Sequence, residues 1–177
     1  MHVYTISPSP DSTLAVEISR HGLQKRKHLF VFEQYTGELA YDPDHPLNSR
    51  LRLSVEADSL SVRGAQEKKR SSQQLARFAL SQVLRVQDHP SLRIESQRFI
   101  AKPLRGFVVE CVLYFRGMDR IFKANIGFGV EKNGRLQLDA DATLRLSELK
   151  LPRPSSLCGL IRTEDEIVLH ALIWGVH

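Results

Sequence analysis

The stretch "RLQLDADATLRL" (residues 135–146) alternates between apolar and polar side chains without a break. Successive side chains of a strand point to opposite faces, so this period predicts a strand with one buried face and one hydrated face. The dipeptide Asn133-Gly134 comes just before it, and Asn-Gly is the strongest short signal for a hairpin turn. A strand that follows a hairpin turn and has a fully apolar face must be buried against other strands.

The same alternation recurs along most of the chain. It is found in residues 12–19, 29–42, 51–62, 91–100, 106–115, 120–130 and 165–175. In the third of these segments the alternation slips after Asp58, which predicts a bulge where the strand bends. Gly37 predicts a second bulge or bend, because glycine accepts backbone angles that other residues avoid. The basic residues 20–28 lie between two alternating segments and are predicted to form a turn or loop.

One segment changes period. Residues 71–86 carry apolar side chains every three to four positions, which predicts an α-helix with Ser71 or Ser72 as its N-cap. The chain therefore holds about eight strands and one inserted helix. A closed antiparallel barrel removes unpaired strand edges, and strands of ten or more residues with slips suit it better than the alternative, a sandwich.

The composition favours one domain over residues 1–177. The chain has 177 residues, 42% of them apolar, and no repeat or low-complexity linker. No run approaches the ~20 apolar residues of a membrane-spanning helix, and no signal peptide is recognised at the start, so we expect a cytoplasmic protein.

The formal net charge of +5 is compatible with an acidic partner but requires none. Two basic runs, "QKRKH" (24–28) and "KKR" (68–70), could bind a phosphate or keep the surface soluble. Aromatic residues do not interleave with these runs, so we expect no nucleic-acid partner.

The sequence offers no pattern of catalytic or metal-binding residues. The seven histidines do not cluster, and His170 is expected to be an ordinary strand histidine. Cys111 lies on an apolar face and is expected to behave as a small hydrophobic residue, while Cys158 lies in a loop. Asp139 and Asp141 share a polar face and are expected to be solvated charges. These observations predict a binding module without catalytic or metal-ligating residues.

The order of several motifs resembles the YceI-like family of polyisoprenoid-binding proteins, as a divergent member without a signal peptide. The similar stretches are "YTISPSPDSTLAVEI", "FEQYTGELAYDPDHPLNSRLRLSVEADSL", "LRVQDHPSLRIES", "LYFRGMDRIFKANIGF" and "TEDEIVLHALI". The resemblance implies an extended, lipocalin-like barrel that binds a long apolar chain, such as an isoprenoid, a quinone or a fatty acid, and needs no other cofactor. It also implies a role in lipid transport or storage, or in a stress response.

Several positions depart from the family pattern. The usual Asp and His of the opening motif are Ser7 and Pro10, the usual His of one hairpin is Arg116, and residues 147–151 lack the usual aromatic residue and glycine. The departures concern polar groups at the mouth of the barrel, so they affect the expected ligand more than the expected fold.

If the resemblance carries over, the apolar faces of the strands line the lumen and contact the ligand. The predicted wall residues are Leu51, Leu53, Val55, Phe107, Val109, Leu113, Phe122, Ile126, Phe128, Leu136, Leu138, Leu169 and Ile173. Peripheral contact with a membrane and a homodimer both stay open.

Two alternatives also remain. One is a barrel filled by its own side chains that binds an acidic partner through Lys25, Arg26 and Lys27. The other, the least favoured, is an esterase-like enzyme that uses Cys158 or His170.

Overall fold

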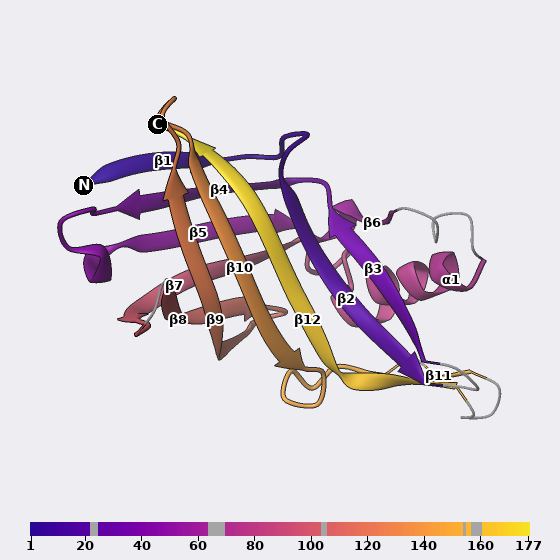
Figure 1. The fold of residues 1–177 in the computed structure, drawn as a ribbon. Helices are drawn as coiled ribbons and strands as arrows, with labels where there is room; N and C mark the ends of the chain where they lie inside the picture. Colours follow the sequence, from indigo (N-terminus) through magenta and orange to yellow (C-terminus); the bar gives the residue numbers. More distant parts are fainter. Residues whose placement is uncertain (22–24, 64–69, 104–105, 154, 157–160) are drawn as a thin grey trace.

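The fold is mainly β, and the computed structural model describes residues 1–21, 25–63, 70–103, 106–153, 155–156 and 161–177 (Figure 1). Its strands are β1 (His2–Ile6), β2 (Thr13–His21), β3 (Arg26–Phe32), β4 (Tyr35–Tyr41), β5 (Arg50–Glu56), β6 (Leu60–Val62), β7 (Ser91–Ala101), β8 (Phe107–Phe115), β9 (Met118–Val130), β10 (Leu136–Arg145), β11 (Ser155–Ser156) and β12 (Ile161–Val176). The helix α1 (Arg70–Phe78) continues directly into a π-helical turn, η4 (Ala79–Leu84). Two short 3-10 turns are η1 (Pro46–Asn48) and η2 (Ala57–Ser59).

Eight strands form the closed barrel, in the order β1-β4-β5-β7-β8-β9-β10-β12. Every neighbouring pair is antiparallel, and the ring closes where β12 returns to β1 through the pairs Thr5↔Val176 and Ile6↔Gly175. The predicted eight-stranded antiparallel barrel with one inserted helix is therefore confirmed.

The sheet forks along β12. Near its end β12 pairs with β1, and further back the same edge pairs with β2, which continues the sheet to β3 and β6. β1 and β2 are thus two parts of one long edge, separated by the loop of residues 7–12. Figure 1 shows β2 and β3 diverging from β1 and β4, with α1 beside the free side of β6. The helix and the adjoining turn therefore complete the part of the barrel that the strands leave open.

Local breaks in the strands change which residues face inward. Phe30 and Phe32 are buried in β3 at even positions, whereas Tyr35 and Leu39 are buried in β4 at odd positions, so the two residues between these strands shift the alternation. The shift predicted after Asp58 is also present, but as the 3-10 turn η2 rather than as a bulge. Each break lets a long strand bend around the barrel while it keeps an apolar inner face.

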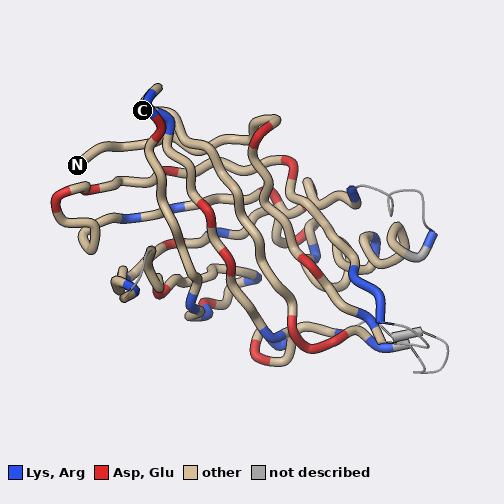
Figure 2. The backbone as a smooth tube through the Cα atoms, in the orientation of Figure 1, with Lys and Arg blue, Asp and Glu red and all other residues tan. Residues whose placement is uncertain are grey.

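The inner faces form one apolar core. In β10 the even-numbered residues are buried or partly buried, while Asp139 and Asp141 on the odd side are exposed. Along the strands in Figure 2, charged residues occur mostly as separate positions, apart from a basic run at the start of β3 and an acidic run, residues 164–166, in the first part of β12. The charges therefore interrupt the outer surface and leave the interior apolar.

Three local predictions were wrong. Residues 20–28 are not all loop, because β2 extends to His21 and β3 begins at Arg26. A basic residue can lie in a strand when its side chain faces outward. Lys27 does so, with 64% of its side chain exposed. The helix begins at Arg70, ahead of both predicted N-cap serines, and the hydroxyl of Ser72 instead shares a 3.1 Å hydrogen bond with Nδ1 of His28.

Gly37 does not form the predicted bulge. The register of β4 with both neighbouring strands passes through it without a shift. A Cβ atom at this position would lie 2.5 Å from the carbonyl oxygen of Arg52. Glycine is needed here because the two strands approach closely. Gly37 therefore marks a close contact between strands rather than a bulge.

Candidate binding lumen

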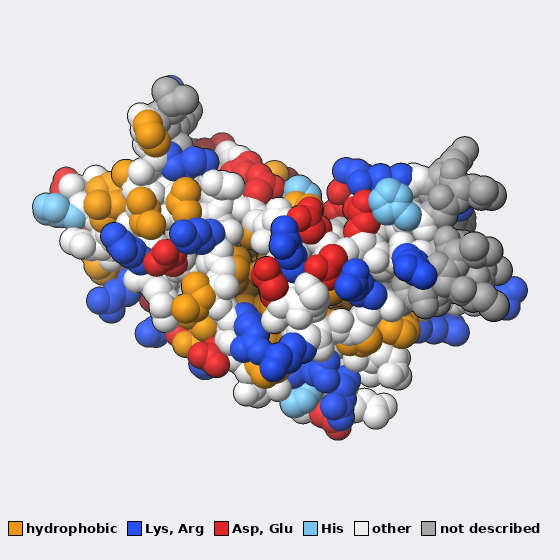
Figure 3. Space-filling view, turned by 90° about the horizontal axis from the view of Figure 1, so that it is seen from below, with side chains coloured by type: hydrophobic (Ala, Val, Ile, Leu, Met, Phe, Trp, Pro, Cys, Tyr) orange, Lys and Arg blue, Asp and Glu red, His pale blue; other side chains and the backbone are white. Residues whose placement is uncertain are grey.

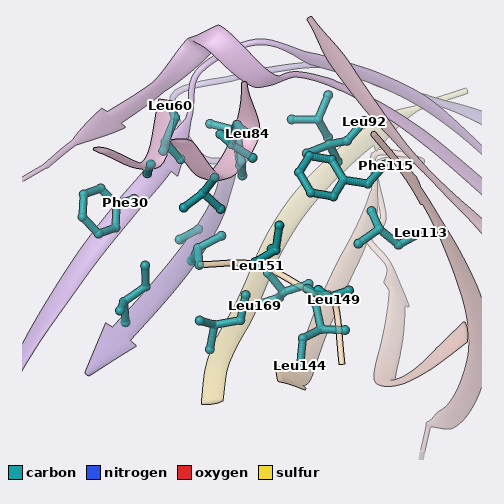
Figure 4. Close-up of a pocket in the computed structure, with 18 of the residues that line it drawn as sticks. Phe30, Leu60, Leu84, Leu92, Leu113, Phe115, Leu144, Leu149, Leu151 and Leu169 are labelled. Atoms are coloured by element: carbon teal, nitrogen blue, oxygen red, sulfur yellow. The ribbon is translucent and has the colours of Figure 1, made fainter. Parts of the chain in front are cut away.

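Two apolar cavities lie inside the barrel, with volumes of about 130 Å³ and about 60 Å³. They share Leu14, Ile94 and Leu169 as wall residues, so they lie next to each other. Around the larger cavity, Phe30, Leu84 and Phe115 converge from β3, η4 and β8 (Figure 4). The two cavities lie in the part of the barrel interior that the sequence predicted to be apolar.

The larger cavity has only apolar lining residues among those the structure describes. A buried water needs two to four polar partners, so a space with such walls stays dry. An apolar molecule gains free energy by entering it, because its surface is removed from water. The arrangement is suited to apolar ligands and unsuited to ions or sugars.

The thirteen predicted wall residues all belong to the core or pack against it. Those that line the larger cavity are Val55, Leu113 and Leu169. Those that line the smaller cavity are Leu51, Leu53, Phe122, Ile126, Leu138, Leu169 and Ile173. Their contact with a ligand stays a prediction.

The other four predicted wall residues lie elsewhere in the core. Val109 and Leu136 are fully buried and line neither cavity. Phe107 and Phe128 pack with Tyr41 and Phe99, with ring centroids 5.5–6.0 Å apart. This aromatic cluster lies near the ends of β4, β7, β8 and β9, and Tyr41, Phe107 and Phe128 also line a more open, partly polar pocket of about 520 Å³.

Two segments of the wall of the larger cavity were not predicted from the sequence. Ala79, Val83 and Leu84 of η4 line one part of it, and the turn of residues 146–151 contributes three leucines to another part. The leucine spacing in "LSELKL" was a usable signal, because three apolar residues are unusual in an exposed turn. We call η4 and residues 146–151 the cover.

Side chains at the rim hold the cover in place. Nη1 of Arg116 donates a hydrogen bond to the carbonyl oxygen of Val83, at 3.2 Å. The carboxylate of Asp165 accepts hydrogen bonds from the backbone N–H and the hydroxyl of Ser147, and these bonds lower the pKa of Asp165. The rim therefore fastens both parts of the cover through polar contacts outside the apolar space.

The basic run at the start of β3 is paired with carboxylates. Nζ of Lys25 lies 2.9 Å from Glu164, and Nζ of Lys27 lies 2.7 Å from Glu17. On the face shown in Figure 3, Lys and Arg side chains lie among Asp and Glu side chains. Residues 24, 68 and 69 lie outside the described residues. The hypothesis of an acidic partner therefore stays a prediction that no observation favours.

Among the titratable residues described, Cys111 and Asp141 line the smaller cavity and none lines the larger one. Burial raises the pKa of the Cys111 thiol to about 12, so this thiol stays protonated at neutral pH. His170 donates a hydrogen bond to Asp141 on the outer face, and both side chains are about half exposed. Cys158 lies outside the described residues. Within the described ranges, no three His, Cys, Asp or Glu side chains are placed to hold a metal ion.

The His28–Ser72 pair was not anticipated. Its two side chains are 5% and 0% exposed, and they join β3 to α1. Neither residue lines a cavity. We interpret this pair as a contact that anchors the helix. In the part of the chain with described structure, no helix is long and apolar enough to span a membrane.

Residues 4–171 match the YceI-like domain family, so the chain belongs to this family. No protein in the curated set matches it significantly in sequence. Its fold is similar to that of BcnA from Burkholderia cenocepacia, with a TM-score of 0.73, 9% identity, and coverage of 92% of this chain and 95% of that one. It is also similar to a polyisoprenoid binding domain from Saccharophagus degradans, with a TM-score of 0.64, 9% identity, and coverage of 99% and 100%. The YCEI protein of Campylobacter jejuni gives a TM-score of 0.59, 16% identity and 84% coverage of both chains. At sequence identities this low, the structural similarity shows a shared fold and nothing more.

Proposed function

We propose that the protein binds the apolar chain of a lipid inside its barrel and performs no chemistry on it. The observation that carries this proposal is the wholly apolar lining of the larger cavity within a closed barrel. The similarity to the Saccharophagus degradans polyisoprenoid binding domain supports an isoprenoid or a related chain as the ligand. The lumen would contribute no nucleophile from the residues described, because the thiol of Cys111 is held protonated by burial.

The size of the cavities constrains how such a ligand enters. Ligand sites usually measure about 300–1,000 Å³, and the larger cavity measures about 130 Å³. A long chain therefore requires the cover to move outward, and the polar rim contacts are the ones that must yield. The bound chain would extend from the larger cavity into the smaller one past Leu169, which lines both.

The free energy of burial sets a minimum chain length. Each buried methylene contributes ~0.8 kcal/mol, so one five-carbon isoprene unit contributes about 4 kcal/mol before costs. Association costs about 4–15 kcal/mol, so between about one and four such units are needed before binding is favourable. A chain of this length is shielded from water when bound, which suits lipid transport or storage.

Extraction of the purified protein with organic solvent, followed by mass spectrometry, tests the proposal directly. We expect a lipid with an apolar chain of at least the length that the burial estimate requires. An extract without lipid, together with no binding when phytol is added, would overturn the proposal.

A pair of variants locates the binding. Leu169→Trp places an indole between the two cavities and is expected to block the chain. Leu172→Trp is the matched control, because Leu172 lies on the outer face of the same strand and is 37% exposed. Equal binding by both variants would show that the chain does not occupy the lumen.

A further inference from the structure

A polar hollow of about 310 Å³ opens at the fork of the sheet. The loop of residues 7–12 forms one side, and the junction of β3 and β4 forms the other. Two of its walls, Leu14 and Phe32, also line the larger apolar cavity. Leu14 and Phe32 therefore lie between the hollow and the lumen.

Tyr35 presents a buried hydroxyl at the hollow. Its side chain lines the hollow and is only 3% exposed, with its ring in the core. Within the described part of the chain, the phenolic oxygen is buried and makes no hydrogen bond of good geometry. The hydroxyl of Ser12 lies near enough to lower the pKa of Tyr35, against the larger effect of burial. A buried hydroxyl without a partner costs free energy, so native structures rarely keep one without a reason. Burial also raises the pKa of Tyr35, which keeps the phenol neutral and able to donate.

The two charged side chains at the hollow, Arg63 and Glu33, form an ion pair, so their charges cancel. Nε of Arg63 donates to Oε1 of Glu33 at 3.0 Å, and the hydroxyl of Ser61 donates to the same oxygen at 2.7 Å. The hydroxyl of Ser12 is shared with other groups, because it lies 2.8 Å from the hydroxyl of Ser9 and its oxygen accepts a hydrogen bond from the backbone N–H of Trp174 at 3.0 Å. An anion would gain little net attraction here, whereas an uncharged oxygen could accept a hydrogen bond from Tyr35.

We propose that this hollow receives the uncharged head, a hydroxyl or a carbonyl, of the lipid whose chain occupies the lumen, and that Tyr35 donates a hydrogen bond to it. This inference rests on the proposed function and adds the class of head group. The head lies in the hollow, and the chain passes between Leu14 and Phe32 into the larger cavity. The order of preference follows: a neutral alcohol binds better than the corresponding hydrocarbon or phosphate.

Three compounds with one carbon skeleton test this preference: phytol, phytane and phytyl phosphate. We measure their affinities by displacement of a fluorescent fatty acid from the wild type, from Tyr35→Phe and from Tyr41→Phe. The Tyr35→Phe variant is expected to bind phytol about 3- to 10-fold more weakly and phytane unchanged, since only the hydrogen bond is lost. Tyr41→Phe is the control, because Tyr41 lies on the same strand within the aromatic cluster.

A second measurement needs no ligand. Because the hydroxyl makes no hydrogen bond of good geometry, Tyr35→Phe without lipid is expected to melt at the wild-type temperature or above it. A clearly lower melting temperature would overturn the inference, since the hydroxyl would then have a stabilising partner.

The binding outcomes separate the two proposals. If none of the three compounds binds, both the inference and the proposed function are wrong. If phytol and phytane bind equally well, or phytyl phosphate binds best, the inference is wrong while the proposed function stands. If phytol binds best and only Tyr35→Phe removes that preference, the inference is supported.

Discussion

The larger cavity predicts that a bigger side chain at Ala79 stabilises the protein. Ala79 is 8% exposed and lines the cavity from η4. Ala79→Leu adds three carbon atoms to a dry space of about 130 Å³. At ~0.8 kcal/mol per buried methylene this gives about 2 kcal/mol, from which about 0.5–1 kcal/mol is lost as side-chain entropy. The expected net gain in the free energy of unfolding is about 1–2 kcal/mol.

The assay is thermal unfolding of lipid-free protein, compared with a matched control. For a chain of this size we expect a rise in Tm of about 3–6 °C. Ala76→Leu is the control, because Ala76 lies one turn earlier, is 9% exposed and lines neither cavity. The control is expected to lose about 1–3 kcal/mol through overpacking. Ala79→Leu should also weaken lipid binding, because the leucine side chain occupies the cavity that the lipid chain would fill.

Two results would refute this reasoning. If Ala79→Leu is destabilised as much as Ala76→Leu, the cavity has no room for the added atoms. If Ala79→Leu gains stability and binds lipid as well as the wild type, the larger cavity is not where the chain lies.

Three further predictions concern single groups. In the Cys158→Ser variant, Cys111 should resist thiol reagents at pH 8 until the protein unfolds, because burial raises its pKa to about 12. Asp165→Asn should lower stability at pH 7, and its difference from the wild type should close below about pH 4, because a carboxylate with a lowered folded pKa stabilises above its unfolded pKa and loses that effect as pH falls. Arg116→Ala should speed amide hydrogen exchange in η4 and shorten the lifetime of bound lipid, because it removes the hydrogen bond to the cover.

Each of these has a contrary result. Rapid labelling of folded Cys111 would show that the barrel wall opens readily. A stability difference for Asp165→Asn that does not narrow as the pH falls below about 4 would show that charge is not its source. Unchanged exchange in η4 of Arg116→Ala, with Arg52→Ala as an exposed control, would show that the rim bond does not hold the cover.

The barrel could be predicted because alternation is local information. Whether Leu138 points inward depends only on the direction of its own strand, so period two was enough. The fork at β12 could not be predicted, because it depends on pairing between residues near opposite ends of the chain, such as Ile6 and Gly175. His28 was placed in a loop because its basic neighbours obscured a buried position that only Ser72 on a distant helix explains.

The candidate site, like the fold, could be predicted from the sequence only in part. Wall residues on alternating strands were found, while the cover was missed because leucines in the 146–151 turn belong to no regular period. The volume of a cavity depends on how side chains from many strands fit together, and no single segment holds that information. For the same reason, the buried hydroxyl of Tyr35 became visible only after packing placed it beside the 7–12 loop.

The short pairing of β1 with the end of β12 has a consequence for synthesis in the cell. The barrel closes only when Gly175 and Val176 meet Ile6 and Thr5. At about 5–20 residues per second, the ribosome needs roughly 10–30 s to make the intervening chain. During that time β1 can pair with β4 but not with β12, so the ring of strands stays open. A nascent chain of this kind exposes apolar surface until Gly175 and Val176 emerge, and such surface is what chaperones bind.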